Sequence, residues 1–102
     1  MDKLNKHEML DPVDAEELSE FFKMYADPTR LKILDVLFKQ EVSVGELADL
    51  LEMTHSSISH QLAVLRRSRI VKGRREHKNI FYSLDDKHIE VIFHFAFEHI
   101  KE

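Results

Sequence analysis

The sequence predicts a small α+β fold that is mostly α-helical with a single β-hairpin. Its 102 residues include only two Gly and two Pro, and 43% are hydrophobic, which favours helices around a modest core. Apolar residues recur at helical spacing over most of the chain, whereas β-forming residues flank a turn between positions 70 and 84. Cysteine is absent, which excludes disulfides and thiolate metal sites. Any bound metal must therefore be held by nitrogen and oxygen.

The chain is predicted to form one domain. We expect residues 1–12 to be a flexible N-terminal segment and residues 13–102 to fold together. No apolar run approaches the ~20 residues of a membrane-spanning helix. The N-terminus also lacks the apolar stretch of a signal peptide. These features predict a cytoplasmic protein.

Helix-start signals define the first two helices. Asp14 can cap a helix that continues to about Tyr25. Asp27 is followed by Pro28, which combines a capping acid with proline at the first helical position. A second helix is therefore predicted from there to about Lys39.

The centre of the chain contains the pattern of a helix-turn-helix. Ser43 and Glu46 form a capping box, which predicts a short helix beginning there. A break at residues 54–56 precedes another helix, which is predicted to start at Ser56 or Ser57 and to end near residue 68. We interpret this second helix as a DNA recognition helix.

A predicted hairpin and a final helix complete the order of elements. Residues 70–72 and 80–84 favour strands, and the residues between them favour a turn. Asp85 or Asp86 then caps a last helix. The order helix, helix, helix-turn-helix, hairpin, helix is that of a winged helix-turn-helix.

Two details of the helix-turn-helix can be tested in the structure. Ala48 and Ile58, ten residues apart, occupy the small and apolar positions through which the two helices of such a motif pack. Glu52 lies where the motif usually has glycine, so we expect some backbone strain at the turn.

The net charge of −4 conceals a basic band on an acidic chain. Residues 56–80 contain seven Lys and Arg and one acid, a net charge of +6, so the other residues carry −10. A concentrated basic region of this kind favours nucleic-acid binding, although an ordinary solvated surface is the alternative.

Polar side chains of the predicted recognition helix and wing are suited to contact DNA. Serine, histidine and glutamine near the start of the helix can reach base edges, whereas arginine and lysine further along are suited to phosphates. Helix capping and ordinary surface polarity are the alternatives for the shorter side chains. The candidate DNA-binding residues are Ser56, Ser57, Ser59, His60, Gln61, Arg66, Arg67, Lys72, Arg74, Arg75 and Lys78.

The predicted last helix carries metal-ligand chemistry at both of its ends. Asp86 and His88 lie at its start, and His99 and Glu102 lie at its end. At 100° per residue, His88, His99 and Glu102 share one stripe with apolar residues, within roughly 80° of each other. Two imidazoles and two carboxylates suit a divalent cation such as zinc. A packed helix interface with structural histidines is the alternative.

The spacing of these residues requires a second chain if they bind metal. His88 and His99 are separated by about 16 Å along a helix that rises 1.5 Å per residue. One ion with ligands at ~2 Å cannot be reached from both ends. An antiparallel second copy would place Asp86 and His88 opposite the partner subunit's His99 and Glu102, giving two equivalent sites per dimer. His94 falls on the opposite, polar face, and His7 is a candidate supplementary ligand.

Three segments resemble the ArsR/SmtB family of metal-responsive repressors. ADPTRLKILDVL at residues 26–37 resembles the opening signature of the family, and residues 44–84, with the SHQL of the recognition helix, resemble its helix-turn-helix and wing. The spacing Asp-x-His, ten residues, His, two residues, Glu is similar to the zinc-sensing site on the last helix of the family. Other members sense metals through a cysteine pair, whereas here Ser43 and Gly45 lie in the corresponding segment.

The resemblance implies a winged helix-turn-helix homodimer that pairs through its N- and C-terminal helices. It also implies a repressor of metal-efflux or resistance genes that leaves operator DNA when zinc, with cobalt as the alternative, binds at Asp86, His88, His99 and Glu102. A winged-helix repressor responding to another signal, with structural histidines, stays open. So does a protein-interaction module. We expect no enzyme, because no His-Glu-x-x-His motif or base and nucleophile pair is present.

Overall fold

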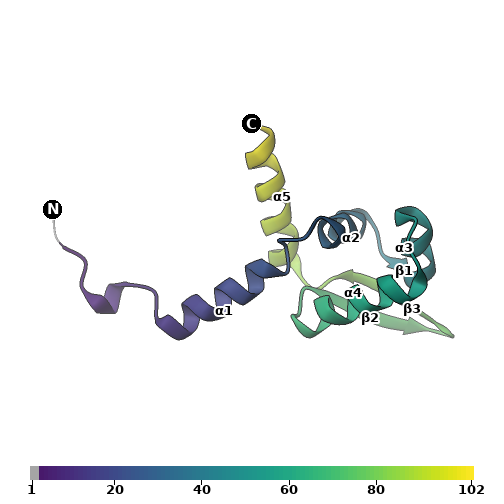
Figure 1. The fold of residues 1–102 in the computed structure, drawn as a ribbon, viewed down its shortest axis with the longest axis horizontal. Coiled ribbons are helices and arrows are strands. Elements are labelled where there is room, and N and C mark those ends of the chain that lie inside the picture. Colours follow the sequence, from purple (N-terminus) through teal and green to yellow (C-terminus); the bar gives the residue numbers. More distant parts are fainter. Residues whose placement is uncertain (1–2) are drawn as a thin grey trace.

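The computed structural model describes residues 3–102 and contains helices in the predicted order around a small sheet (Figure 1). The elements are a 3-10 helix at Lys6–Glu8, α1 (Pro12–Lys23), α2 (Pro28–Lys39), β1 (Val42–Ser43), α3 (Val44–Leu51), α4 (His55–Arg67), β2 (Val71–Glu76), β3 (Asn79–Leu84) and α5 (Lys87–Lys101). This architecture confirms the predicted winged helix-turn-helix.

A compact body runs from α2 to β3 and contains almost all of the core. Its buried residues come from the inner faces of α2, α3 and α4 and from the sheet, whose strands lie in the order β1-β3-β2. The described buried hydrophobic residues are Ile33, Leu34, Leu37, Val42, Leu47, Ala48, Ile58, Leu62, Leu65, Ile70, Val71, Leu84 and Ile89.

The helix-turn-helix has the predicted packing and the predicted strain. Ala48 and Ile58 are both buried between α3 and α4. Glu52 ends α3 with φ 54°, a left-handed conformation that favours glycine. The predicted start of the recognition helix was too late. Thr54 caps α4 by accepting a hydrogen bond from the Ser57 amide at 3.0 Å, so Ser56 already lies within the helix.

The sheet is larger than the predicted hairpin. β2 and β3 pair from Val71 opposite Leu84 to Glu76 opposite Asn79, which leaves a turn of only two residues at the tip. The expected turn at residues 73–79 was therefore too long. The strand β1 was not predicted, because its two residues are too few to produce an alternating pattern.

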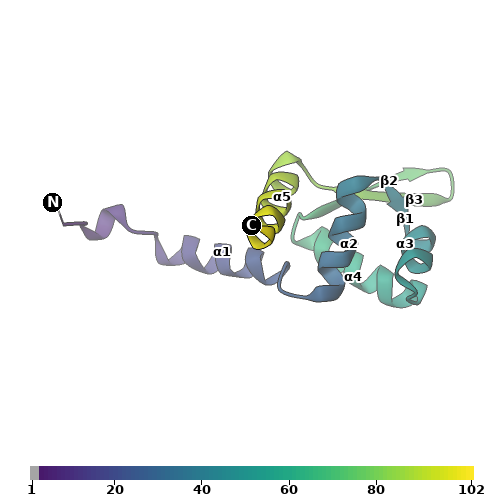
Figure 2. The same cartoon turned by 90° about the horizontal axis from the view of Figure 1, so that it is seen from above.

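Two helices project from the body, and they are the first and the last (Figures 1 and 2). No residue of α1 is buried, and Ile89 is the buried residue of α5. The hairpin tip lies at the other end of the molecule from α1, and the longest dimension of the molecule is 58 Å. The α1 helix starts at Pro12 and is capped by Asp11, so the predicted cap at Asp14 was wrong by one turn. Asp86 caps α5, as one of the two predicted alternatives.

Across residues 3–102, no helix combines the length and the apolar character needed to cross a membrane.

Candidate functional site

The recognition helix presents most of its predicted DNA-binding side chains to solvent. Ser56, Ser57, Ser59 and His60 are exposed along its first two turns, while Ile58 and Leu62 anchor its other side in the core. The cap at Thr54 fixes where the helix begins. Arg66 and Arg67 are exposed in its last turn. The helix is thus held by its apolar side and offers a polar side to a ligand.

Gln61 differs from the other candidate residues of α4 because another residue of the same chain hydrogen-bonds to its side chain. The Nε atom of Arg30 in α2 donates to the Gln61 side-chain oxygen at 3.0 Å, and the pair is partly buried. Arg30 also points a guanidinium nitrogen at the sulfur of Met24, 3.7 Å away. Gln61 therefore ties α4 to α2 and to the end of α1, in addition to any role at DNA.

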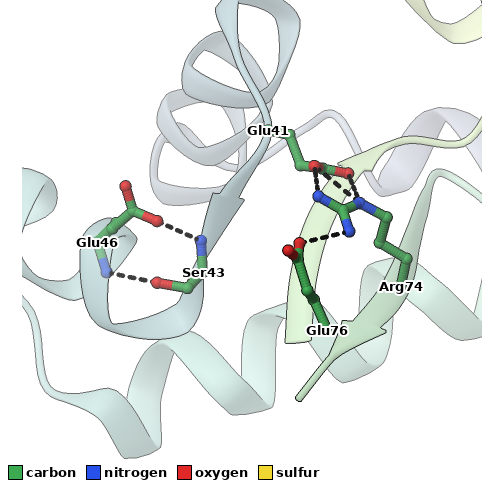
Figure 3. A network of polar contacts seen from close by, with 5 residues as sticks. All are labelled: Glu41, Ser43, Glu46, Arg74 and Glu76. Atoms are coloured by element: carbon green, nitrogen blue, oxygen red, sulfur yellow. Dashed lines mark hydrogen bonds and ion pairs between the residues drawn. The ribbon is translucent and has the colours of Figure 1, made fainter. Parts of the chain in front are cut away.

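The wing contains free cations and one arginine that is already paired. Lys72, Arg75 and Lys78 are exposed and make no ion pair within residues 3–102. Arg74 instead binds Glu41 and Glu76 (Figure 3). In the two-residue turn at the tip, His77 has φ 58°. This left-handed conformation, which is uncommon for residues other than glycine, reverses the chain between β2 and β3.

The contacts of the Arg74 cluster also shift the pKa values of Glu41 and Arg74. Hydrogen bonding from Arg74 lowers the pKa of Glu41. Desolvation opposes this lowering, and the positive charges of Arg74 and Lys72 add to it. The carboxylates of Glu41 and Glu76 in turn raise the pKa of Arg74. Glu41 and Arg74 are therefore both charged at neutral pH.

Asp86 and His88 are adjacent at the start of α5. One Asp86 oxygen, Oδ1, accepts from the backbone amides of His88 at 2.8 Å and Ile89 at 3.2 Å. The other, Oδ2, lies 3.4 Å from His88 Nδ1. Desolvation raises the pKa of Asp86, but these hydrogen bonds more than offset it and lower the pKa. A carboxylate oxygen and an imidazole nitrogen are thus side by side and open to solvent.

His99 and Glu102 are exposed at the far end of α5, away from Asp86 and His88. Within residues 3–102 of a single chain, no three His, Asp or Glu side chains gather into a metal-binding group. This agrees with the helix rise, which prevents both ends from serving one ion. His94 belongs to another face, where it stacks on Phe38 and its Nε2 lies 3.2 Å from Glu98.

The surface between α1 and α5 is apolar and hollowed. Phe97 and Ile100 of α5 are 55% and 76% exposed, and Phe22 of α1 is 53% exposed. They line a hollow of about 550 Å³, together with the ring of Tyr25. The Tyr25 hydroxyl is buried and has no hydrogen-bond partner among residues 3–102, and this burial, with the nearby charge of Asp86, raises its pKa to about 12.

Comparisons with known proteins agree with this geometry. Residues 27–72 match the model of the family described as bacterial regulatory protein, arsR family. The transcriptional repressor SmtB homolog of Synechocystis is 40% identical over 88 residues, which cover 86% of this chain and 67% of that protein. The chain belongs to the arsR family of bacterial regulatory proteins. Members of this family bind operator DNA, and this chain is a transcriptional regulator of the same kind.

Two further relatives support the assignment to the arsR family. The cadmium resistance transcriptional regulatory protein CadC homolog of Staphylococcus aureus is 37% identical over 84% of this chain and 72% of that protein. The solved structure of a homodimeric winged helix-turn-helix DNA-binding domain from Mycobacterium bovis has a TM-score of 0.84. It is 25% identical and covers 93% of this chain and 90% of that one. All of these relatives are regulators, and none indicates an enzyme.

Sequence reasoning did not identify Arg30 and Glu41, the two residues that tie the candidate DNA-binding residues to the body. Their partners, Gln61 and Arg74, lie 31 and 33 positions away. No local pattern signals such pairs. The only hint for Glu41 was its place next to a β-branched residue before the capping box, and this was too short to be interpreted.

Proposed function

We propose that this arsR-family protein is a zinc-responsive repressor that binds operator DNA as a homodimer and releases it when zinc binds between the subunits. One observation carries this proposal. The α5 helix has an Asp and a His at its start and a His and a Glu at its end, two candidate ligand pairs, with exposed apolar residues between them. Such a helix is incomplete in one chain and is completed by an antiparallel copy of itself.

The first ligand pair fits a metal ion well. Asp86 uses Oδ1 to cap α5, so the cap leaves Oδ2 unused, and Oδ2 lies 3.4 Å from His88 Nδ1. The cap thereby orients the carboxylate without consuming it. In the dimer, His99 and Glu102 of the partner subunit would add a second nitrogen and a second oxygen. The same arrangement repeated by symmetry gives two ions per dimer.

The donor set favours zinc. Two imidazole nitrogens and two carboxylate oxygens suit a four-coordinate zinc site, with cobalt as the alternative, whereas nickel usually requires more ligands. Cysteine is absent from the chain, so soft thiophilic metals have no thiolate ligand. When bound, zinc supplies a fixed link between the two subunits.

The apolar faces of α1 and α5 support a dimer. Phe22, Phe97 and Ile100 form part of an exposed apolar surface on helices that make little contact with their own core. Large exposed apolar patches are typical of protein interfaces. The homodimeric relative from Mycobacterium bovis has the same fold. A dimer of this kind would bury both faces and bring opposite ends of two α5 helices together.

The body provides the DNA-binding half of the proposal. In a winged helix-turn-helix dimer, two recognition helices lie about 34 Å apart and enter successive major grooves. The exposed polar residues at the start of α4 would approach bases, and Arg66, Arg67 and the wing cations would approach phosphates. This distribution puts the positive charge of the chain where DNA binds.

Zinc and DNA are coupled through the shape of the dimer. If zinc favours a dimer that positions the recognition helices poorly, it weakens DNA binding, and DNA weakens zinc binding by the same free energy. Arg30 of α2 contacts both Met24, at the end of α1, and Gln61 of the recognition helix. A change at the dimer helices therefore has a physical route to α4.

Fluorescence anisotropy with a DNA duplex selected from a random pool by the metal-free protein tests this function. Saturating zinc is expected to weaken binding by one to two orders of magnitude, the usual range of coupling free energies. Unchanged affinity would contradict zinc sensing and favour a regulator with another signal. Failure to bind any selected duplex would favour a protein-interaction module.

A matched pair of variants separates the ligand from the scaffold. His99→Ala is expected to abolish the zinc response and to leave metal-free DNA binding intact. His94→Ala, on the other face of the same helix, is expected to keep the response, because His94 contacts Phe38 and Glu98 rather than the ligand pair. Equal loss in both variants would mean that α5 was simply disrupted.

A further inference from the structure

We propose that Arg74 is a positioning residue that fixes the wing on the body, and that Lys72, Arg75 and Lys78 carry the DNA contacts of the wing. This goes beyond the zinc response and rests on DNA binding by the wing. It also divides the predicted DNA-binding residues of the wing into two classes. The evidence is the bonding of Arg74, its place in the sheet and the charge around it.

The guanidinium of Arg74 bridges two edge strands across the central one. Arg74 belongs to β2 and Glu41 immediately precedes β1, and β3 lies between these strands. Arg74 Nε donates to both Glu41 oxygens at 2.9 and 3.0 Å, and Nη2 donates to Oε1 at 2.7 Å. The short, two-pronged contact restricts the position of β2 relative to the segment that leaves α2.

Two further contacts hold the same side chain. Nη1 donates to Glu76 Oε2 at 2.8 Å, two residues along β2 and on the same face of the strand (Figure 3). The guanidinium carbon also lies 5.2 Å from the ring centre of Phe81, its cross-strand partner on β3. Arg74 is therefore held by β2, by β3 and by the residue before β1, and each of its three nitrogens donates to a carboxylate.

The charge balance around Arg74 disfavours a phosphate contact. Glu41 and Glu76 carry two negative charges, which offset the positive charges of Arg74 and of the nearby Lys72, so a phosphate approaching Arg74 meets no net positive charge. Lys72, Arg75 and Lys78 have no such partners within the described chain. Side chains alternate along a strand, so Arg75 projects from the face opposite Arg74.

A positioning residue and a phosphate-contacting residue should respond differently when they are replaced and the salt concentration is varied. For a phosphate contact, Arg75→Gln should lower the slope of log affinity against log salt by about 0.9. Arg74→Gln should leave the slope unchanged and weaken binding by roughly two- to fivefold, the range of an exposed ion-pair network. Glu41→Gln should also weaken binding, although it removes a negative charge from a DNA-binding surface.

Anisotropy titrations of these variants on the selected duplex at several salt concentrations measure both effects. A lower slope in Arg74→Gln, or tighter binding by Glu41→Gln, would overturn the proposal. In the charge-swapped pair Glu41→Lys with Arg74→Glu, amide hydrogen exchange in β2 and β3 should be slower than in Arg74→Glu alone, since the bridge is rebuilt with reversed signs. No recovery would also count against a positioning role.

Amide hydrogen exchange in the free protein tests the same proposal without DNA. Exchange in β2 and β3 should be faster in Arg74→Gln and Glu41→Gln than in the wild type, and unchanged in Arg75→Gln. Equal exchange in all four proteins would overturn the proposal. If the wild type binds no duplex, the proposed function fails, and the exchange result still decides whether Arg74 holds the wing.

Discussion

The body and the two projecting helices show two different ways in which this sequence specifies structure. From α2 to β3, apolar side chains meet one another inside a single chain, and all of the described buried hydrophobic residues except Ile89 lie there. In α1 and α5, large apolar residues such as Phe22 and Phe97 stay exposed. The body buries its apolar side chains within one chain, whereas the exposed apolar faces of α1 and α5 are suited to pack against a second copy of the chain.

This difference matters for function because each region carries one half of the proposal. The body holds the recognition helix and the wing, which need a rigid scaffold to reach DNA. The projecting helix α5 holds the proposed ligand pairs, which would need a second subunit to complete them. The proposed metal sensing therefore depends on α1 and α5, the two α-helices with the fewest buried residues of their own.

The largest expected effect is a loss of stability of the body. Leu62→Ala removes a buried side chain from the centre of the core and should lower the free energy of unfolding by about 2–5 kcal/mol. Urea denaturation measures the loss. Leu50→Ala, at a position that is 57% exposed on α3, should change it by less than about 0.5 kcal/mol. Similar losses in the two variants would mean that the core is placed wrongly.

The next largest effect breaks the dimer and spares the body. Phe97→Glu puts a charge in the apolar surface of α5 and should weaken dimerisation by about 2 kcal/mol or more, because aromatic residues at interface centres contribute most. Sedimentation velocity should show monomers whose circular dichroism keeps the helical signal. Asp49→Lys, on the exposed side of α3, should remain dimeric. A dimeric Phe97→Glu protein would place the interface elsewhere.

A smaller effect tests where the recognition helix begins. Thr54→Ala removes the side chain that accepts from the Ser57 amide and should cost about 1 kcal/mol of stability. Ser56→Ala lies one position inside the helix and makes no capping bond, so it should cost much less. If Ser56→Ala were the more damaging variant in denaturation, the helix would start at the later position that its sequence suggested.

The smallest effect concerns pH and the junction of α1 with α5. Burial raises the pKa of Tyr25 to about 12, above its ordinary value of 10. The folded state therefore keeps this proton longer than the unfolded state does. The resulting stability is present below pH 10 and is lost as pH rises from 10 toward 12. Urea denaturation of wild type and Tyr25→Phe over this range should show a shallower decline in the variant, and parallel curves would contradict the assignment.

Local signals explain which parts of the fold were predictable. The capping box of Ser43 with Glu46 and the Asp27-Pro28 pair fixed helix starts that the structure confirms, because a cap depends on neighbours within three residues. The start of α4 was misplaced because several consecutive residues are good caps. The tertiary fold, in which α4 packs through Ile58, selects Thr54 among them.

Long-range contacts explain what could not be predicted. The candidate DNA-binding residues could be chosen from the sequence, but the contacts that two of them make within the chain could not be predicted. Gln61 is held by Arg30, and Arg74 by Glu41, through pairs that form only after the body folds. For the metal site, sequence spacing predicted ligands at opposite ends of one helix. The structure places Asp86 and His88 at one end of α5 and His99 and Glu102 at the other, and their binding of a metal stays a prediction. Their assembly across two subunits stays a prediction.

Mixing two defective proteins tests the central claim of a site shared between subunits most directly. His88→Ala and His99→Ala homodimers each lack a ligand in both sites. A mixed dimer would have one site missing both histidines and one complete site, and random exchange makes about half of the dimers mixed. Zinc competition with a coloured chelator should show tight binding that returns on mixing, at about one ion per two dimers. No recovery after subunit exchange would contradict the account.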